Sequence, residues 1–219
     1  MYIPKLRYPG HIIDHPDNEC GSKVLRLLTS LEHPLAAATL ALEWFVKAQS
    51  TYESDLLSHQ SPSETVNTIP SNPGQVADDL PWSYKRQIVF VHAHTFVYSL
   101  DRIDRTLQVL LALLDGSYDI SDIYKYFQNS IPDLREVRNS SAHSEDRMRG
   151  LGRDKQPIVP NPLGFIMLEN LHGTKFMSTM ANGNLGKVDV TLDTLKASET
   201  AIQAVIDLLK WKGLPYQWP

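Results

Sequence analysis

The sequence predicts an all-α fold, a helical bundle with one small antiparallel β-hairpin inserted before its C-terminal helix. Apolar residues recur at steps of three and four over the long segments of the chain, which is the spacing of a buried helix face. Runs that favour β structure, separated by glycine, lie between residues 164 and 190. With 219 residues, 42% of them hydrophobic, the chain is long enough to bury one core.

The chain is predicted to divide into an N-terminal arm and a single domain. Residues 1–21, rich in Pro, His and Asp, form the arm, and residues 22–219 form the domain. Within the domain, residues 59–81 contain four prolines and are expected to be a long polar loop. Residues 164–190 hold the hairpin insertion, and residues 191–212 form the C-terminal helix.

Four helical segments are predicted before the hairpin. An apolar stripe runs over residues 31–56, and Pro34 is placed near a helix start because proline is tolerated in the first turn but not in the middle. Residues 83–114 form one long helix and residues 121–129 a short one. A further helix, opened by a proline and ended by a glycine, covers residues 132–150.

Composition and charge argue against several classes of protein. The net charge of −4 does not fit the broad basic surface of a general nucleic-acid coat, although it leaves room for a local cationic site. A single cysteine, Cys20, rules out an internal disulfide and fits a reducing compartment. No apolar run is long enough for a membrane span, and the N-terminus lacks the layout of a secretory signal. We therefore expect a cytoplasmic protein with no membrane partner.

The segment "RNSSAH", residues 138–143, gathers the side chains of a candidate active site. Asn139 and His143 are four residues apart, so on a helix they share one face, where the amide can orient the imidazole. Arg138 flanks that face with a permanent planar cation, which suits a phosphate. The segment therefore predicts a phosphodiester site with Arg138, Asn139 and His143 as its catalytic residues.

An arginine and a histidine can cleave RNA without a metal ion. The imidazole can take the proton of a ribose 2′-OH or protonate the leaving 5′-oxygen, and the guanidinium stabilises the charge of the transition state. One histidine cannot perform both proton transfers in a single step. A two-fold homodimer would supply a second copy of His143, so we expect a dimer with RNA as its substrate.

This motif, an arginine, a polar residue, three further residues and a histidine late in a helical bundle, resembles the signature of the HEPN superfamily. The resemblance implies a HEPN-like helical bundle, commonly dimeric, and a metal-independent endoribonuclease with a composite active site at the dimer interface. It also implies a toxin–antitoxin or phage-defence setting, with an antitoxin or another protein as partner. Arg138 and His143 would then be the catalytic pair and Asn139 the supporting polar residue.

Further polar residues near the motif are predicted to bind the substrate. Between residues 135 and 155, six basic residues stand against four acidic ones, enough for a local cationic patch. The acidic residues of the long helix, Asp101 and Asp104, are expected on a solvated face, with Asp101 paired to Arg105. The substrate-binding candidates are Arg135, Ser140, Ser141, Arg147 and, from the long helix, Arg102.

No metal or cofactor is expected. His92 and His94 lie inside the long helix, where residues two apart diverge by about 200° and cannot hold one metal together. The segment "GNLGK" lacks the Ser or Thr that follows the lysine of a phosphate-binding loop. It also leads into a predicted strand rather than a helix.

Two alternatives stay open from the sequence. The "RNSSAH" segment can be an ordinary solvated helix whose charged residues pair with each other. The protein can also be a non-catalytic helical adaptor that binds a nucleotide, RNA or a protein partner. The enzyme needs Arg138 and His143 exposed in a cleft, whereas the adaptor predicts side chains held in intramolecular salt bridges.

Overall fold

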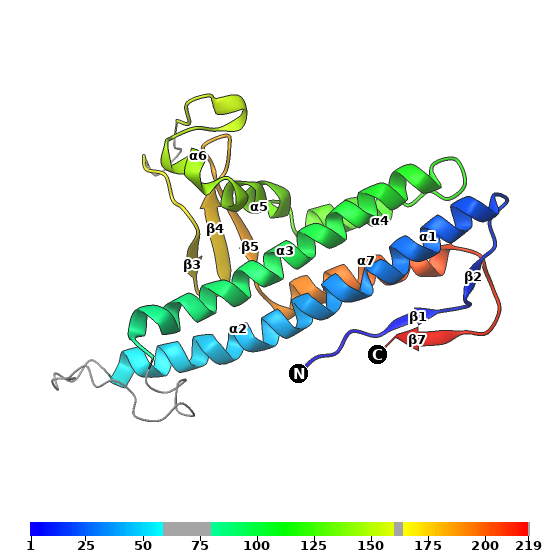
Figure 1. Ribbon diagram of the computed structural model, residues 1–219, viewed down its shortest axis with the longest axis horizontal. Helices are drawn as coiled ribbons and strands as arrows, with labels where there is room; N and C mark the ends of the chain where they lie inside the picture. Colours follow the sequence, from blue (N-terminus) through cyan, green and yellow to red (C-terminus); the bar gives the residue numbers. More distant parts are fainter. Residues whose placement is uncertain (59–79, 160–163, 219) are drawn as a thin grey trace.

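The protein is mostly helical, and two long antiparallel helices lie side by side along its long axis (Figure 1). These are α2 (Glu32–Ser58) and α3 (Trp82–Leu114), which pack against each other. The computed structural model describes residues 1–58, 80–159 and 164–218. Pro34 lies in the first turn of α2, where its missing N–H costs no hydrogen bond.

Three further helices complete the bundle. Helix α1 (Asn18–Ser30) continues the direction of α2, α4 (Ser121–Ser130) packs on α3 and α7, and α7 (Leu192–Leu208) packs on the α2–α3 pair (Figure 1). The predicted apolar stripes face inward, and each fully buried side chain contributes about 1.5–3 kcal/mol. The core includes Leu35, Phe45, Phe96, Leu107 and Ile202.

Two helix bounds differ from the prediction. Helix α1 begins inside the predicted arm, because Asp17 caps it by accepting hydrogen bonds from the backbone N of Glu19 and Cys20 at 2.8 and 3.2 Å. Helix α7 begins after Thr191, as predicted, and Thr191 is its N-cap. It ends at Leu208, before the predicted bound, because the chain then extends into a strand.

The all-α prediction needs a correction, because small antiparallel sheets also join the two ends of the chain. Strand β1 (Leu6–Tyr8) pairs with β7 (Tyr216–Trp218), and β2 (Ile12–Ile13) pairs with β6 (Trp211–Lys212). Leu6 and Tyr8 face the core while Arg7 faces outward. Strands of two or three residues carry too little alternation to be recognised, and their partners lie at opposite ends of the sequence.

The predicted hairpin insertion is a three-stranded antiparallel sheet. Strands β3 (Asn170–His172), β4 (Lys175–Thr179) and β5 (Leu185–Asp189) pair in that order. Gly183 lies in the β4–β5 turn with a φ of +86°, and a Cβ there would lie 2.2 Å from the carbonyl O of Val159. Only glycine fits this turn.

The helix predicted over residues 132–150 is broken into α5 (Leu134–Ala142) and α6 (Ser144–Met148). His143 lies at the break, with φ −119° and ψ 41°. Helix α5 packs on α3 and on strands β4 and β5, while α6 lies farther from the long helices (Figure 1). The break places the motif histidine at a helix end rather than in the middle of a helix.

The polar loop predicted over residues 59–81 lies outside the described residues except for Leu80 and Pro81. Among the described residues, no helix is both long and apolar enough to cross a membrane. Helices α2 and α3 have the length, but charged residues interrupt their apolar stretches.

Candidate functional site

His143 is exposed at the end of α5 and lines a pocket of about 370 Å³. Asn139 lines the same pocket one turn earlier, and its carbonyl O accepts a hydrogen bond from the His143 backbone N at 3.0 Å. Arg153 and Lys155 line the pocket from the segment after α6. No described residue hydrogen-bonds the imidazole, so both of its nitrogens are open to a ligand.

The charges around this pocket are balanced. Three acidic side chains line it together with three basic ones, and Arg153 Nη2 lies 3.0 Å from Glu136 Oε1 in an ion pair across the rim. The cationic excess that the sequence shows over residues 135–155 therefore does not gather at the His143 pocket. The charged lining residues are Glu136, Asp146, Asp154, Arg147, Arg153 and Lys155.

Arg138 does not line this pocket, because its side chain turns toward α3 and is only 13% exposed. Its Nη2 donates to Asp101 Oδ2 at 2.5 Å and its Nη1 donates to Asn139 Oδ1 at 3.0 Å. The Asn139 amide therefore holds the guanidinium rather than the imidazole, which corrects the expected role of this side chain. Arg138 and His143 belong to one segment but point to different surroundings.

Asp101 and Asp104 are buried, with 3% and 4% of their surface exposed, so their predicted solvated face is wrong. Helix α5 covers this side of α3, which the sequence of α3 alone cannot show. Arg105 Nε lies 2.8 Å from Asp101 Oδ2, which confirms the expected pair. Two arginines thus share one carboxylate oxygen, while Asp101 Oδ1 and Arg138 Nε have no hydrogen-bond partner among the described residues.

Arg135, whose side chain is 43% exposed, is held by the buried Asp104 and Tyr124 between α3, α4 and α5. Its Nη2 lies 2.5 Å from Asp104 Oδ2 and 3.3 Å from the Tyr124 hydroxyl, and that hydroxyl donates to Asp104 Oδ1 at 2.9 Å. The hydrogen bond to Asp104 raises the pKa of Arg135. Burial raises the pKa of Tyr124, and its bond to Asp104 acts in the same direction. Arg135 therefore serves the packing of α5.

Arg147, another substrate-binding candidate, is buried and bound within the protein. Only 4% of its surface is exposed, its Nε donates to Ser140 Oγ at 3.4 Å and its Nη1 donates to the carbonyl O of Leu151. These bonds fix the turn after α6 to α5. Both predicted substrate-binding residues, Arg147 and Ser140, are therefore buried and hydrogen-bonded to each other.

Ser141 and Arg102 have different surroundings. The Ser141 hydroxyl donates to Glu169, whose second oxygen lies 3.0 Å from His94 Nε2. This contact links α5, α3 and the segment before β3. Arg102 is exposed on α3 and makes no ion pair with any described residue. His94 and Glu169 were not among the predicted site residues, because their pairing joins segments distant in the sequence.

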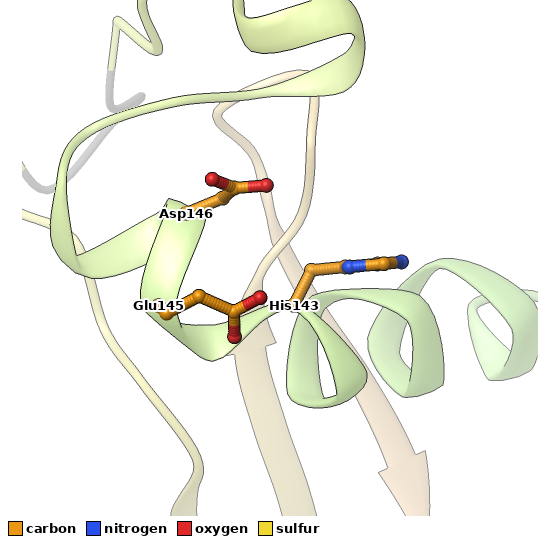
Figure 2. A group of neighbouring side chains, drawn as sticks. All are labelled: His143, Glu145 and Asp146. Carbon is orange, nitrogen blue, oxygen red and sulfur yellow. The ribbon is translucent and has the colours of Figure 1, made fainter.

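One cluster near the site could hold a metal ion, and the sequence prediction missed it. The ligand atoms of His143, Glu145 and Asp146 all lie within 4.8 Å of one another. Figure 2 shows His143 at the break between α5 and α6, and Glu145 and Asp146 on the first turn of α6. His143 and Glu145 are exposed. Asp146 also forms an ion pair, because its Oδ1 lies 3.8 Å from Arg149 Nη1. The two carboxylates bring negative charge beside the imidazole.

Comparisons with known proteins found no match: no family model, no curated protein and no solved structure is significantly similar to the chain. The feature that offers chemistry to a ligand at this pocket is the imidazole of His143, which has no hydrogen-bond partner among the described residues.

Proposed function

We propose that this protein is a HEPN-like helical bundle that acts as a metal-independent endoribonuclease. The observation that carries the proposal is the exposed imidazole of His143, which lines a pocket with Asn139 and has no hydrogen-bond partner among the described residues. A histidine free of internal partners can accept a proton from a ligand or donate one to it, which acid–base cleavage of RNA requires. Lys155 on the same pocket supplies a cation for a flanking phosphate, and Arg153 can supply a second one by leaving Glu136.

The proposed reaction is an attack within the RNA chain. The imidazole of one protomer takes the proton of the ribose 2′-OH, and the 2′-oxygen bonds to the adjacent phosphorus. The bond from phosphorus to the 5′-oxygen breaks, and the His143 imidazolium of the partner subunit protonates that oxygen. The products are a 2′,3′-cyclic phosphate and a 5′-hydroxyl, so no water or metal is consumed. Each site then needs two copies of the chain.

Arg138 can stabilise the transition state in this scheme only by exchanging its partner. Asp101 also binds Arg105, so the carboxylate keeps one cation when Arg138 turns toward a phosphate. The unpartnered Nε of Arg138 offers a further donor for that phosphate. In the proposed setting, a cytoplasmic toxin–antitoxin or phage-defence system, a protein partner restrains cleavage.

The test is RNA cleavage by a His143→Ala variant in the presence of EDTA. We expect the wild-type protein to cleave a single-stranded RNA under these conditions and His143→Ala to lose about 100-fold or more of that activity. His172→Ala is the matched control, because His172 is an exposed histidine on β3, away from the pocket. Equal cleavage by wild type and His143→Ala would overturn the assignment.

A second candidate function is a non-catalytic adaptor, and one observation favours it. The guanidinium of Arg138 is bound to Asp101 and Asn139 and is mostly buried, which is the arrangement expected of a structural arginine. An adaptor would bind RNA or a protein without changing it. RNA that binds and is recovered intact, from a dimeric wild-type preparation, would favour the adaptor over the enzyme.

A further inference from the structure

Helix α3 carries a ladder of flat and cationic side chains, defined as Arg86, Phe90, His94, Tyr98 and Arg102. Its members are spaced four residues apart. Four residues turn an α-helix by about 400°, so each member lies about 40° around the axis from the one before. Over its five members the ladder therefore turns by about 160°, so it crosses α3 obliquely, with Arg86 and Arg102 on nearly opposite sides of the helix. Phe90 and His94 are half-buried, and the other three members are exposed.

Two neighbouring pairs of the ladder are stacked, and a third cation lies over one of its rings. The Arg86 guanidinium carbon lies 5.6 Å from the centre of the Phe90 ring, and the rings of His94 and Tyr98 lie 5.8 Å apart at an angle of 13°. The guanidinium of Arg138 lies 5.9 Å from the centre of the Tyr98 ring. The exposed Tyr98 ring thus has the His94 ring and the Arg138 guanidinium as its neighbours.

The first half of the ladder lines a concave surface. Arg86, Phe90 and His94 line a pocket of about 610 Å³, with hydroxyl and amide groups from Ser83, Gln87 and Thr95 around them. A pocket of this size lies in the range that holds small organic ligands. Flat rings, a guanidinium and hydroxyls in one hollow can stack on a base and hydrogen-bond its polar edge.

Two cations of the ladder have no acidic partner in the part of the chain that the structure describes. Neither Arg86 nor Arg102 forms an ion pair with a described residue. Glu169, the acidic residue of the pocket, already accepts hydrogen bonds from His94 and Ser141. In a protein with a net charge of −4, unpaired arginines at both ends of an aromatic series suit a polyanion that carries flat rings.

Contacts connect the ladder to the His143 pocket. Tyr98 lies against the Arg138 guanidinium, whose Nη1 donates to the Asn139 side chain, and Asn139 lines the pocket with His143. These contacts run through the largely buried Arg138 side chain, so they connect the ladder to Asn139 at the edge of the His143 pocket.

We propose that the ladder on α3 binds single-stranded RNA and leads it to His143, an inference that rests on the proposed ribonuclease function for its end point. Aromatic rings stack on unpaired bases and cations bind the backbone, which is how sequence-tolerant single-strand sites work. Bases within a duplex are stacked on each other and are not available to such rings. The substrate class is thus unpaired RNA.

The experiment measures RNA affinity by fluorescence anisotropy in the full-length His143→Ala background, so that the RNA stays intact. We expect Tyr98→Ala to weaken binding of an unstructured RNA by about 10- to 100-fold, the loss of one stacked base. We expect the double change Arg86→Gln, Arg102→Gln to weaken binding and to lower the slope of log affinity against log salt by about 1.4, for two lost phosphate contacts.

Matched controls lie elsewhere on the surface. Arg26→Gln on α1 removes an exposed arginine, and Tyr126→Ala on α4 removes a tyrosine that is 45% exposed. Neither should change the affinity by more than about twofold, because surface changes away from a site have small effects. A duplex of the same sequence should bind weakly and should not respond to Tyr98→Ala.

The outcomes separate the two proposals. Binding that depends on the ladder supports the inference even if wild-type protein never cleaves RNA, which would remove only the catalytic function. Cleavage by wild type with unchanged affinity in both ladder variants would overturn the inference and leave the ribonuclease standing. Equal binding of duplex and single strand would also overturn it. Circular dichroism of each variant shows that the helices are intact.

Discussion

At the scale of single residues, the motif carries two kinds of side chain. His143 is exposed and has no internal partner among the described residues, whereas Arg138 shares the buried carboxylate of Asp101 with Arg105. The sequence located the histidine and predicted the pair of Asp101 with Arg105. It could not show that Arg138 joins that pair, because the contact depends on how α5 lies across α3. A loss of activity after changing Arg138 therefore has a structural explanation as well as a catalytic one.

The structural part can be measured by urea unfolding of Arg138→Gln. The change leaves Asp101 buried with Arg105 alone, and we expect the free energy of unfolding to fall by about 2–3 kcal/mol, less than the loss for a buried charge without any partner. Arg149→Gln is the control, since Arg149 is exposed and its contact with Asp146 is 3.8 Å. That change should cost less than about 0.5 kcal/mol. Equal stability of the two variants would show that Asp101 does not need Arg138.

At the scale of elements, buried polar contacts fix α5 to its neighbours. The bounds of α3 and α4 followed from apolar spacing, because that spacing records which face of each helix is buried. The break at His143 could not be predicted from the sequence, because "RNSSAHSEDRMRG" has no proline or glycine near that residue to signal a helix end. The Tyr124 hydroxyl joins α3, α4 and α5 by contacting Asp104, Gln108, Gln128 and Arg135.

Tyr124→Phe tests this junction, because it removes only the hydroxyl. Asp104 and both glutamines then lose a buried partner, and we expect the free energy of unfolding to fall by about 1–3 kcal/mol. Tyr126→Phe in the same helix is the control, because Tyr126 is 45% exposed. If Tyr124→Phe were as stable as wild type, the network would contribute nothing net to the packing of α5. Amide hydrogen exchange shows whether α5 loosens first.

At the scale of the whole molecule, the order of the elements explains why the ends of the chain and the candidate site lie apart. The terminal strands pair beside α1 and α7, and the three-stranded sheet with α5 and α6 lies across α3 (Figure 1). The sequence predicted the inserted sheet from its glycine-separated runs, but the pairing of β1 with β7 needed the assembled bundle. The exposed His143 thus lies on a part of the surface that the paired termini do not cover.

A composite site predicts how mixtures of chains behave. If cleavage needs His143 from both subunits, inactive His143→Ala chains will capture wild-type chains in mixed dimers. With fourfold excess of the variant and random exchange, the activity of each wild-type chain should fall to about one fifth, since only that share finds a wild-type partner. His172→Ala chains added at the same ratio should cause no loss. Light scattering and a cleavage assay on the same samples measure assembly and activity together, and unchanged activity in the mixed sample would mean that one chain suffices.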